Sequence, residues 1–116
     1  MKTVLMLIGF VLGAIHVAEA QQAGKIPRIG YLAVRGASSQ ARVLEGFRQG
    51  LRDLGYIEGK NIIIEYRFAE GKRDLVPAMA ADLVRLKVDV IVSGGAGATR
   101  VAKQATNTIP IVFAQE

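Results

Sequence analysis

The sequence predicts an α/β domain built on a doubly wound parallel sheet. Short apolar runs rich in β-branched residues alternate with amphipathic segments of helical period, and glycines mark most of the junctions between them. The spacing between runs leaves room for a crossover helix, which favours parallel pairing with right-handed connections. We therefore expect strands in the order 2-1-3-4, with the direction of winding reversed between the first and third strands.

The first strand is expected over Arg28–Val34. The loop Arg35–Ser39 then leads into a helix, and either Ser38 or Ser39 can cap its N-terminus with a hydroxyl. Gly55 supplies a left-handed residue just after the helix. The apolar face of this helix consists of Leu44, Phe47, Leu51 and Leu54. Their three-to-four spacing predicts a helix that packs one side on the sheet.

The second strand is expected over Ile62–Phe68, after a turn at Gly59–Asn61. Its run of three isoleucines favours a strand that helices cover on both faces. A turn at Glu70–Lys72 follows, and Asp74 can cap a second helix that tolerates Pro77 in its first turn. The apolar face of that helix is formed by Ala80, Leu83, Val84 and Leu86.

The last part of the chain repeats the alternation of strand, loop and helix. A strand over Val88–Ser93 leads to a glycine-rich loop at Gly94–Gly97, which opens onto a helix over about Ala98–Thr106. A fourth strand over Ile109–Phe113 completes the alternation. These elements predict two central strands whose carboxyl ends are each followed by a loop and a helix.

The N-terminus has the pattern of a secretory signal peptide. Lys2 precedes an apolar run over Val4–Ile15, and Ala18–Ala20 forms a small-x-small cleavage site. A spanning helix needs about 20 apolar residues, and two glycines interrupt this shorter run. We expect cleavage after Ala20, with residues 21–27 as a mature N-terminal tail, and an uncleaved anchor as the alternative.

Composition limits the classes of function. The chain has no cysteine and a formal net charge of +5, so it carries no disulfide framework and no thiol for lipid attachment. Its bases are dispersed beside acids, which indicates a solvated surface and no nucleic-acid footprint. The lone histidine, His16, lies in the signal segment. We therefore expect no transition-metal cluster, no cofactor and no nucleophile–base arrangement for catalysis.

A set of motifs resembles one known family. They are Gly30–Leu32, Gly46–Tyr56, Glu58–Asn61, Glu65–Arg67, Ala69–Gly71, Val88–Val92 and Ile109–Ala114. Together they resemble the ABC transporter substrate-binding proteins of the tryptophan/tyrosine-uptake type over essentially all of Arg28–Ala114. The resemblance implies a type I periplasmic-binding-protein fold, in which two α/β lobes close on a small molecule and present it to a membrane permease. Family members continue past the fourth strand, so we expect residues 28–116 to be an incomplete N-terminal lobe without its second lobe.

The ligand crevice of such a sheet lies outside the carboxyl ends of the strands at the reversal point. Hydroxyls of the first loop and N–H groups of the glycine-rich loop would meet there, and the resemblance to amino-acid-binding relatives implies a carboxylate. The expected ligand contacts are Ser38, Ser39, Gly94, Gly95, Ala96 and Thr99. The alternative for the serines is a helix cap alone, and for the glycines a tight turn alone. Arg35 can meet an anion or stay a solvated loop residue.

Nucleotide-binding motifs do not fit the glycines. Arg100 stands where a dinucleotide fingerprint starting at Gly95 needs a third small residue, and the sequence before Gly59-Lys60 lacks the first glycine of a P-loop.

We expect a non-enzymatic, periplasmic solute-binding component of an ABC importer, with a small-molecule ligand and a permease as partners and no direct membrane insertion after signal cleavage. The alternatives are an exported sensing or regulatory module that uses the same lobe, and an exported α/β enzyme.

Overall fold

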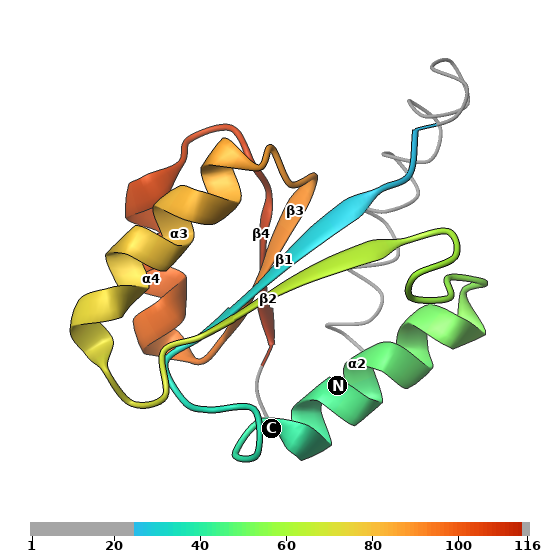
Figure 1. Ribbon diagram of the computed structural model, residues 1–116, viewed down its shortest axis with the longest axis horizontal. Coiled ribbons are helices and arrows are strands. Elements are labelled where there is room, and N and C mark those ends of the chain that lie inside the picture. The colour runs from blue at the N-terminus through green and yellow to red at the C-terminus, as the bar shows by residue number, and fades with distance from the viewer. Residues whose placement is uncertain (1–24, 115–116) are drawn as a thin grey trace.

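The computed structural model describes residues 25–114, which form a parallel sheet covered by helices on both faces (Figure 1). The signal peptide expected over Met1–Ala20 lies outside the described residues. No helix in the described range is both long enough and apolar enough to span a bilayer. The elements are β1 (Arg28–Ala33), α2 (Ala41–Asp53), β2 (Ile63–Phe68), the 3-10 turn η1 (Arg73–Leu75), α3 (Val76–Arg85), β3 (Val90–Gly94), α4 (Ala96–Ala105) and β4 (Ile111–Ala114).

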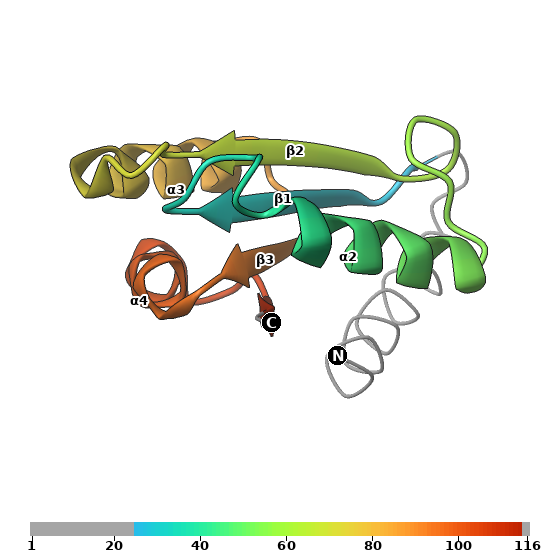
Figure 2. The ribbon, with the colours of Figure 1, turned by 90° about the horizontal axis from the view of Figure 1, so that it is seen from below.

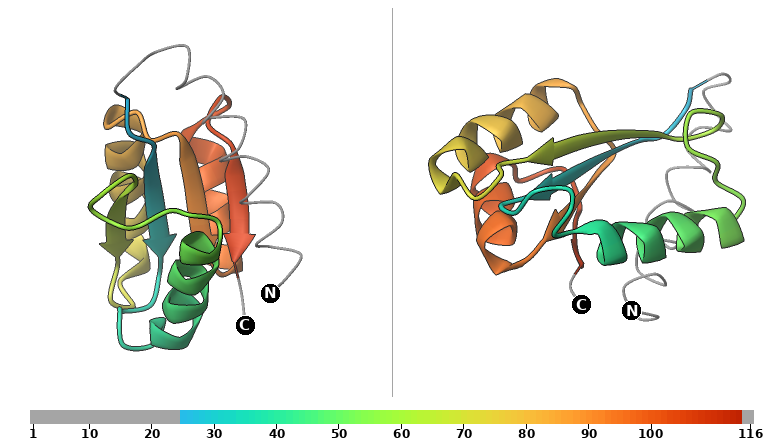
Figure 3. Two further views of the ribbon diagram at one scale, coloured as in Figure 1. Left: turned by 90° about the vertical axis from the view of Figure 1, so that its right-hand side faces the viewer. Right: turned by 60° about the horizontal axis from the view of Figure 1, so that its bottom comes forward.

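The strands are ordered β2-β1-β3-β4, and every neighbouring pair is parallel, which confirms the expected topology. Tyr31 at the centre of β1 pairs with Tyr66 of β2 and Val92 of β3, and Val92 in turn pairs with Val112 of β4. The left view of Figure 3 shows the strands side by side, with α2 on one face and α3 and α4 on the other. The reversal of winding therefore lies between β1 and β3.

The helix α2 covers one face of the sheet with Leu44, Phe47 and Leu51 of the predicted apolar side, whereas Leu54 follows the helix and is 51% exposed, so its expected place on that side is wrong. It joins a buried cluster that includes Ile29, Tyr31, Val43, Leu44, Phe47 and Leu51. Gly55 follows the helix with φ +92°, and the N–H of Tyr56 donates to the carbonyl of Leu51 at 2.8 Å. This pattern is a Schellman motif, so the predicted left-handed glycine cap is confirmed.

The predicted N-terminal caps of two helices are wrong. Gln40, and neither Ser38 nor Ser39, is the capping residue of α2, and no side chain makes a capping hydrogen bond there. Asp74 lies inside η1 and does not cap α3. In each case the chain enters the helix through a backbone turn, whose carbonyls accept the first N–H groups; the N–H of Gln40, for example, donates to Gly36 at 3.2 Å.

The opposite face of the sheet packs against α3 and α4. Its buried cluster contains Leu32, Val76, Ala80, Leu83, Val88, Ile91, Ala98 and Ala102. Pro77 lies in the first turn of α3, as expected. A Cβ atom at Gly30 of β1 would lie 2.9 Å from both methyl carbons of Leu83, so the close approach of α3 to the sheet requires a glycine there.

The second strand is less buried than its isoleucines suggest. β2 is an edge strand, and within it Ile64 is buried while Ile63 is only partly covered. Arg67 of β2 forms an ion pair with Asp82 of α3, in which Nε and Nη2 both donate to Oδ2, at 2.9 and 2.7 Å. The expectation of a strand covered on both faces is therefore corrected, because charged side chains occupy part of one face.

Candidate functional site

A cavity of about 510 Å³ lies at the carboxyl ends of β1 and β3, where the direction of winding reverses. Figure 2 shows the arrowheads of β1, β2 and β3 pointing toward the same end of the molecule, so the loops that follow them gather there. The segment between β1 and α2 contributes Val34, Arg35, Ser39 and Gln40, and α2 adds Val43. The other wall is formed by Arg73 of η1, by Gly94, Gly95, Ala96 and Gly97, and by Ala114 of β4.

One wall of the cavity is the N-terminus of α4. Gly95 is the residue before this helix and has φ +102° and ψ 162°, a conformation that requires glycine. The helix begins at Ala96, two residues earlier than predicted, so Ala96 and Gly97 belong to its first turn. The first N–H groups of a helix have no partner within it and carry the positive end of the helix dipole. This wall of the cavity is therefore electropositive.

Two hydroxyls hold the turn before α4 in place. The hydroxyl of Thr99 donates to the carbonyl of Gly95 at 2.9 Å, and its oxygen lies 2.5 Å from the hydroxyl of Ser93. Because the single proton of Thr99 is used on Gly95, Ser93 is the donor in the second bond. Ser93 is fully buried in β3. The chain Ser93–Thr99–Gly95 therefore fixes the backbone from which the helix N-terminus opens.

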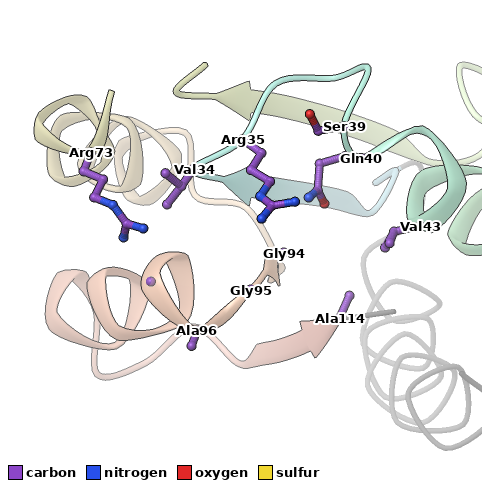
Figure 4. Close-up of a pocket in the computed structure, with 11 residues that line it drawn as sticks. Val34, Arg35, Ser39, Gln40, Val43, Arg73, Gly94, Gly95, Ala96 and Ala114 are labelled. Carbon is purple, nitrogen blue, oxygen red and sulfur yellow. The ribbon is translucent and has the colours of Figure 1, made fainter. Parts of the chain in front are cut away.

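Two arginines extend into the space next to this turn. Figure 4 shows Arg35 reaching from the loop after β1 and Arg73 reaching from the opposite side. A Cβ atom at Gly97 would lie 3.2 Å from Nη1 of Arg73, so this guanidinium lies beside the first turn of α4. Within residues 25–114, neither arginine has a carboxylate partner, and no acidic side chain lines the cavity. Two cations and a helix N-terminus thus surround one space without a counter-charge.

A buried tyrosine supports the remaining polar wall. The hydroxyl of Tyr31 donates to Oε1 of Gln40 at 2.8 Å. Tyr31 is fully buried, and its burial, with a smaller contribution from Tyr66, raises the pKa of its hydroxyl to about 12. The hydroxyl is therefore protonated at any physiological pH. Tyr31 is a core residue, as its place on a strand suggests, and Gln40 links it to the cavity.

The structure brings most of the expected contacts together. Ser39, Gly94, Gly95 and Ala96 line the cavity. Ser38 is exposed on the same turn but does not line it, and the hydroxyl of Thr99 is used inside the protein.

Sequence reasoning did not select Gln40 or Arg73 as contacts, although both line the cavity. Arg73 follows β2, and parallel strands carry their following loops to one edge of the sheet. That rule, applied to the second strand as well as the first and third, would have found Arg73. No local pattern indicates Gln40, because its role depends on Tyr31, nine residues earlier in the chain.

The family model of the ABC transporter substrate binding proteins matches residues 31–116. The chain belongs to this family. A search of curated proteins found no match. Members of the family are binding proteins and not enzymes.

Three solved structures share the fold of this substrate-binding protein. A ligand-free, open substrate-binding protein with adhesive properties from Clostridium difficile is 24% identical, with a TM-score of 0.71 over 76% of the chain. A conserved domain protein from Vibrio cholerae is 29% identical, with a TM-score of 0.72 over 77% of the chain. An ABC domain from Streptococcus pneumonia, solved in complex with L-Trp, is 25% identical, with a TM-score of 0.71 over 77% of the chain.

The chain spans about 30% of the length of each of these structures. Their folds are periplasmic-binding-protein folds, so the sheet of order β2-β1-β3-β4 represents part of that fold. The expected fold class is therefore confirmed.

Proposed function

We propose that this substrate-binding protein captures a small molecule with a carboxylate group, such as an amino acid, for an ABC importer. The observation that carries the proposal is the cavity at the reversal point, where Arg35, Arg73 and the N-terminus of α4 converge without an acidic side chain. The pneumococcal relative in complex with L-Trp supports an amino acid as the ligand class.

The chemistry of this cavity suits an anion. A carboxylate at a helix N-terminus accepts bonds from free N–H groups and interacts favourably with the helix dipole. A guanidinium adds charge-assisted hydrogen bonds that are about twice as strong as neutral ones. The cavity volume of about 510 Å³ falls in the usual range for small-molecule sites. The N–H of Gly95 donates to the carbonyl of Ala114 at 3.3 Å, so we assign the direct contacts to Ser39, to the N–H groups of Ala96 and Gly97 and to the two arginines.

Family membership supports a proposal for the rest of the transport cycle. Capture would be followed by hinge closure of two lobes, the domain motion typical of periplasmic binding proteins. We propose that Met1–Ala20 directs export to the periplasm and that the loaded protein delivers its ligand to a membrane permease. Residues 28–116 would supply part of the N-terminal lobe.

Isothermal titration of the purified chain with each of the twenty L-amino acids tests the proposal. L-tryptophan and tryptamine form a matched pair, because tryptamine lacks only the carboxylate. We expect binding of at least one amino acid and none of tryptamine. Arg35→Gln and Arg73→Gln should each weaken binding by about tenfold or more, the usual effect of losing a charge-assisted hydrogen bond.

Arg100→Gln is the matched control, since Arg100 is an exposed residue of α4 that does not line the cavity. Its affinity should equal that of the unmodified chain. Equal binding of tryptamine and L-tryptophan, or an equal loss in all three arginine variants, would refute the proposed carboxylate site.

A further inference from the structure

The Gln40 side chain stands between the buried core and the cavity. It belongs to the residue that precedes α2, and it lines the cavity beside Arg35. In Figure 4 the side chains of Arg35 and Gln40 both extend from the segment after β1 toward Gly94 and Gly95. The only hydrogen bond of this amide within residues 25–114 is the one from Tyr31 to its oxygen.

The tyrosine holds its position independently of the amide. Its ring lies among those of Phe47, Tyr66 and Phe68, with ring centres 5.9, 6.3 and 6.0 Å away. The buried hydroxyl needs an acceptor for its proton, and leaving it without one would cost about 1–3 kcal/mol. Gln40 Oε1 is its hydrogen-bond partner in the described part of the chain. The amide is therefore held with its oxygen toward Tyr31.

That orientation determines where the amide nitrogen points. The oxygen and nitrogen of a side-chain amide point in different directions from the same carbon, so Nε2 with its two donors is not the atom that meets the phenol. No acceptor within residues 25–114 takes these two protons. Gln40 lines the cavity, and in Figure 4 its amide nitrogen lies on the side of Arg35, another lining residue, so its N–H groups are within the reach of a molecule that occupies the cavity.

Gly94 makes room for this arrangement. A Cβ atom at this position would lie 2.6 Å from Oε1 of Gln40 and 3.0 Å from the hydroxyl oxygen of Tyr31. Any larger residue at position 94 would displace the bonded pair. Unlike Gly95, Gly94 does not have a positive φ. Position 94 therefore needs glycine because a side chain would collide with Gln40 and Tyr31, and not because of its backbone conformation.

We propose that Gln40 is a specificity-determining residue, whose Nε2 donates a hydrogen bond to a carboxylate or carbonyl oxygen of the bound solute. Tyr31 is a positioning residue that fixes the amide in the donor orientation. The inference rests on the proposed function, because it assigns a role within the same cavity. It also predicts that a ligand donor, such as an ammonium group, is rejected at this place, because two donors cannot satisfy each other.

The orientation of the amide is tested first, by NMR of the ¹⁵N-labelled chain without ligand. The side-chain NH₂ protons of Gln40 should show stronger nuclear Overhauser contacts to cavity residues such as Arg35 than to the ring of Tyr31. In Tyr31→Phe the same NH₂ signals should move or broaden, because the amide is free to turn. Strong contacts between the NH₂ protons and the Tyr31 ring would overturn the inference without any binding measurement.

The donor role is tested by titration of the chain with L-tryptophan and the other L-amino acids. Gln40→Glu keeps the acceptor for Tyr31 and removes both N–H donors, so binding should weaken tenfold or more. Gln49→Glu is the matched control, because Gln49 is an exposed residue of α2 and the charge change is the same. Its affinity should be unchanged, and thermal unfolding checks that each variant folds.

A double-mutant cycle separates positioning from general stability. Tyr31→Phe should weaken binding severalfold in the native background and should have no further effect when Gln40 is already Glu. Binding that is insensitive to Gln40→Glu would overturn this inference and leave the proposed function standing. Absence of binding by every amino acid would overturn both, so the two failures are distinguishable.

Discussion

Thr99 shows how one side chain can serve a binding site without touching the ligand. Its hydroxyl accepts from the buried Ser93 and donates to Gly95, the residue on which the N-terminus of α4 depends. The sequence placed Thr99 correctly, one turn into the helix. The expected direct contact between Thr99 and the ligand is replaced by a supporting role, because the only hydroxyl proton of Thr99 is donated to the carbonyl of Gly95.

Thr99→Val should destabilise the fold, because it leaves the buried Ser93 hydroxyl without a partner, at a cost of about 1–3 kcal/mol. Thr99→Ser keeps the hydroxyl and should be close to the native chain in free energy of unfolding. Removing both hydroxyls, in Ser93→Ala with Thr99→Val, should cost less than Thr99→Val alone. Urea unfolding measures all three, and a double variant less stable than Thr99→Val would contradict the proposed hydrogen-bond chain.

Single residues were predictable from the sequence where their role depends on local backbone structure, and not where it depends on distant contacts. Gly55 was predictable because a left-handed cap is local and glycine is its usual residue. The capping role of Ser38 or Ser39 was not realised, because a backbone turn satisfies the same donors without a hydroxyl. Gln40 had no local signal, since its hydrogen bond to Tyr31 joins a loop to the core.

At the scale of elements, the end of α3 repeats the motif that ends α2 but lacks the glycine. Lys87 lies two residues after the end of α3 at Arg85 and has φ +56°, and its N–H donates to the carbonyl of Val84 at 3.0 Å. Left-handed backbone is costly for residues with a Cβ atom. This helix therefore ends on a conformation that its sequence does not favour.

Lys87→Gly should increase the free energy of unfolding by about 0.5–1 kcal/mol, since glycine adopts this conformation without strain. Lys103→Gly is the contrasting control, because Lys103 lies within α4, where glycine should cost about 1 kcal/mol. Chemical denaturation of both variants gives the comparison. Loss of stability in Lys87→Gly equal to that in Lys103→Gly would show that strain at position 87 is absent.

The order of elements was predictable because connection rules are general, whereas their boundaries shifted by about two residues. α4 begins at Ala96 because Gly95 alone makes the turn, which moves Ala96 and Gly97 from the predicted loop into the helix. β2 was expected to be covered on both faces from its isoleucines. β2 lies at the edge of the sheet, and part of one of its faces carries the ion pair between Arg67 and Asp82 in place of apolar side chains.

At the scale of the whole molecule, the parallel sheet gathers the site from distant parts of the chain. The loops after β1 and β3, the turn after β2 and the end of β4 all meet at one edge, and each lines the cavity. The position of the cavity was predictable from strand order alone. Two of its polar side chains, Gln40 and Arg73, were not predicted, because their place in the cavity depends on how the loops are arranged in three dimensions.

A second, smaller cavity of about 180 Å³ provides an internal comparison. It lies near the C-terminal half of α2 and is lined by residues that include Arg48, Tyr56 and Glu58. An ion pair of 3.4 Å joins Arg48 to Glu58, so charge is already compensated there. Only the larger cavity combines unpaired cations with a helix N-terminus among the described residues.

The proposed ligand site lies at the carboxyl ends of β1 and β3. Titration of the ¹⁵N-labelled chain with the twenty L-amino acids, followed by amide chemical shifts, tests it most directly. We expect shifts concentrated in residues 35–40 and 94–97 with at least one amino acid. Shifts concentrated around Arg48, Tyr56 and Glu58, or no shift with any amino acid, would contradict it.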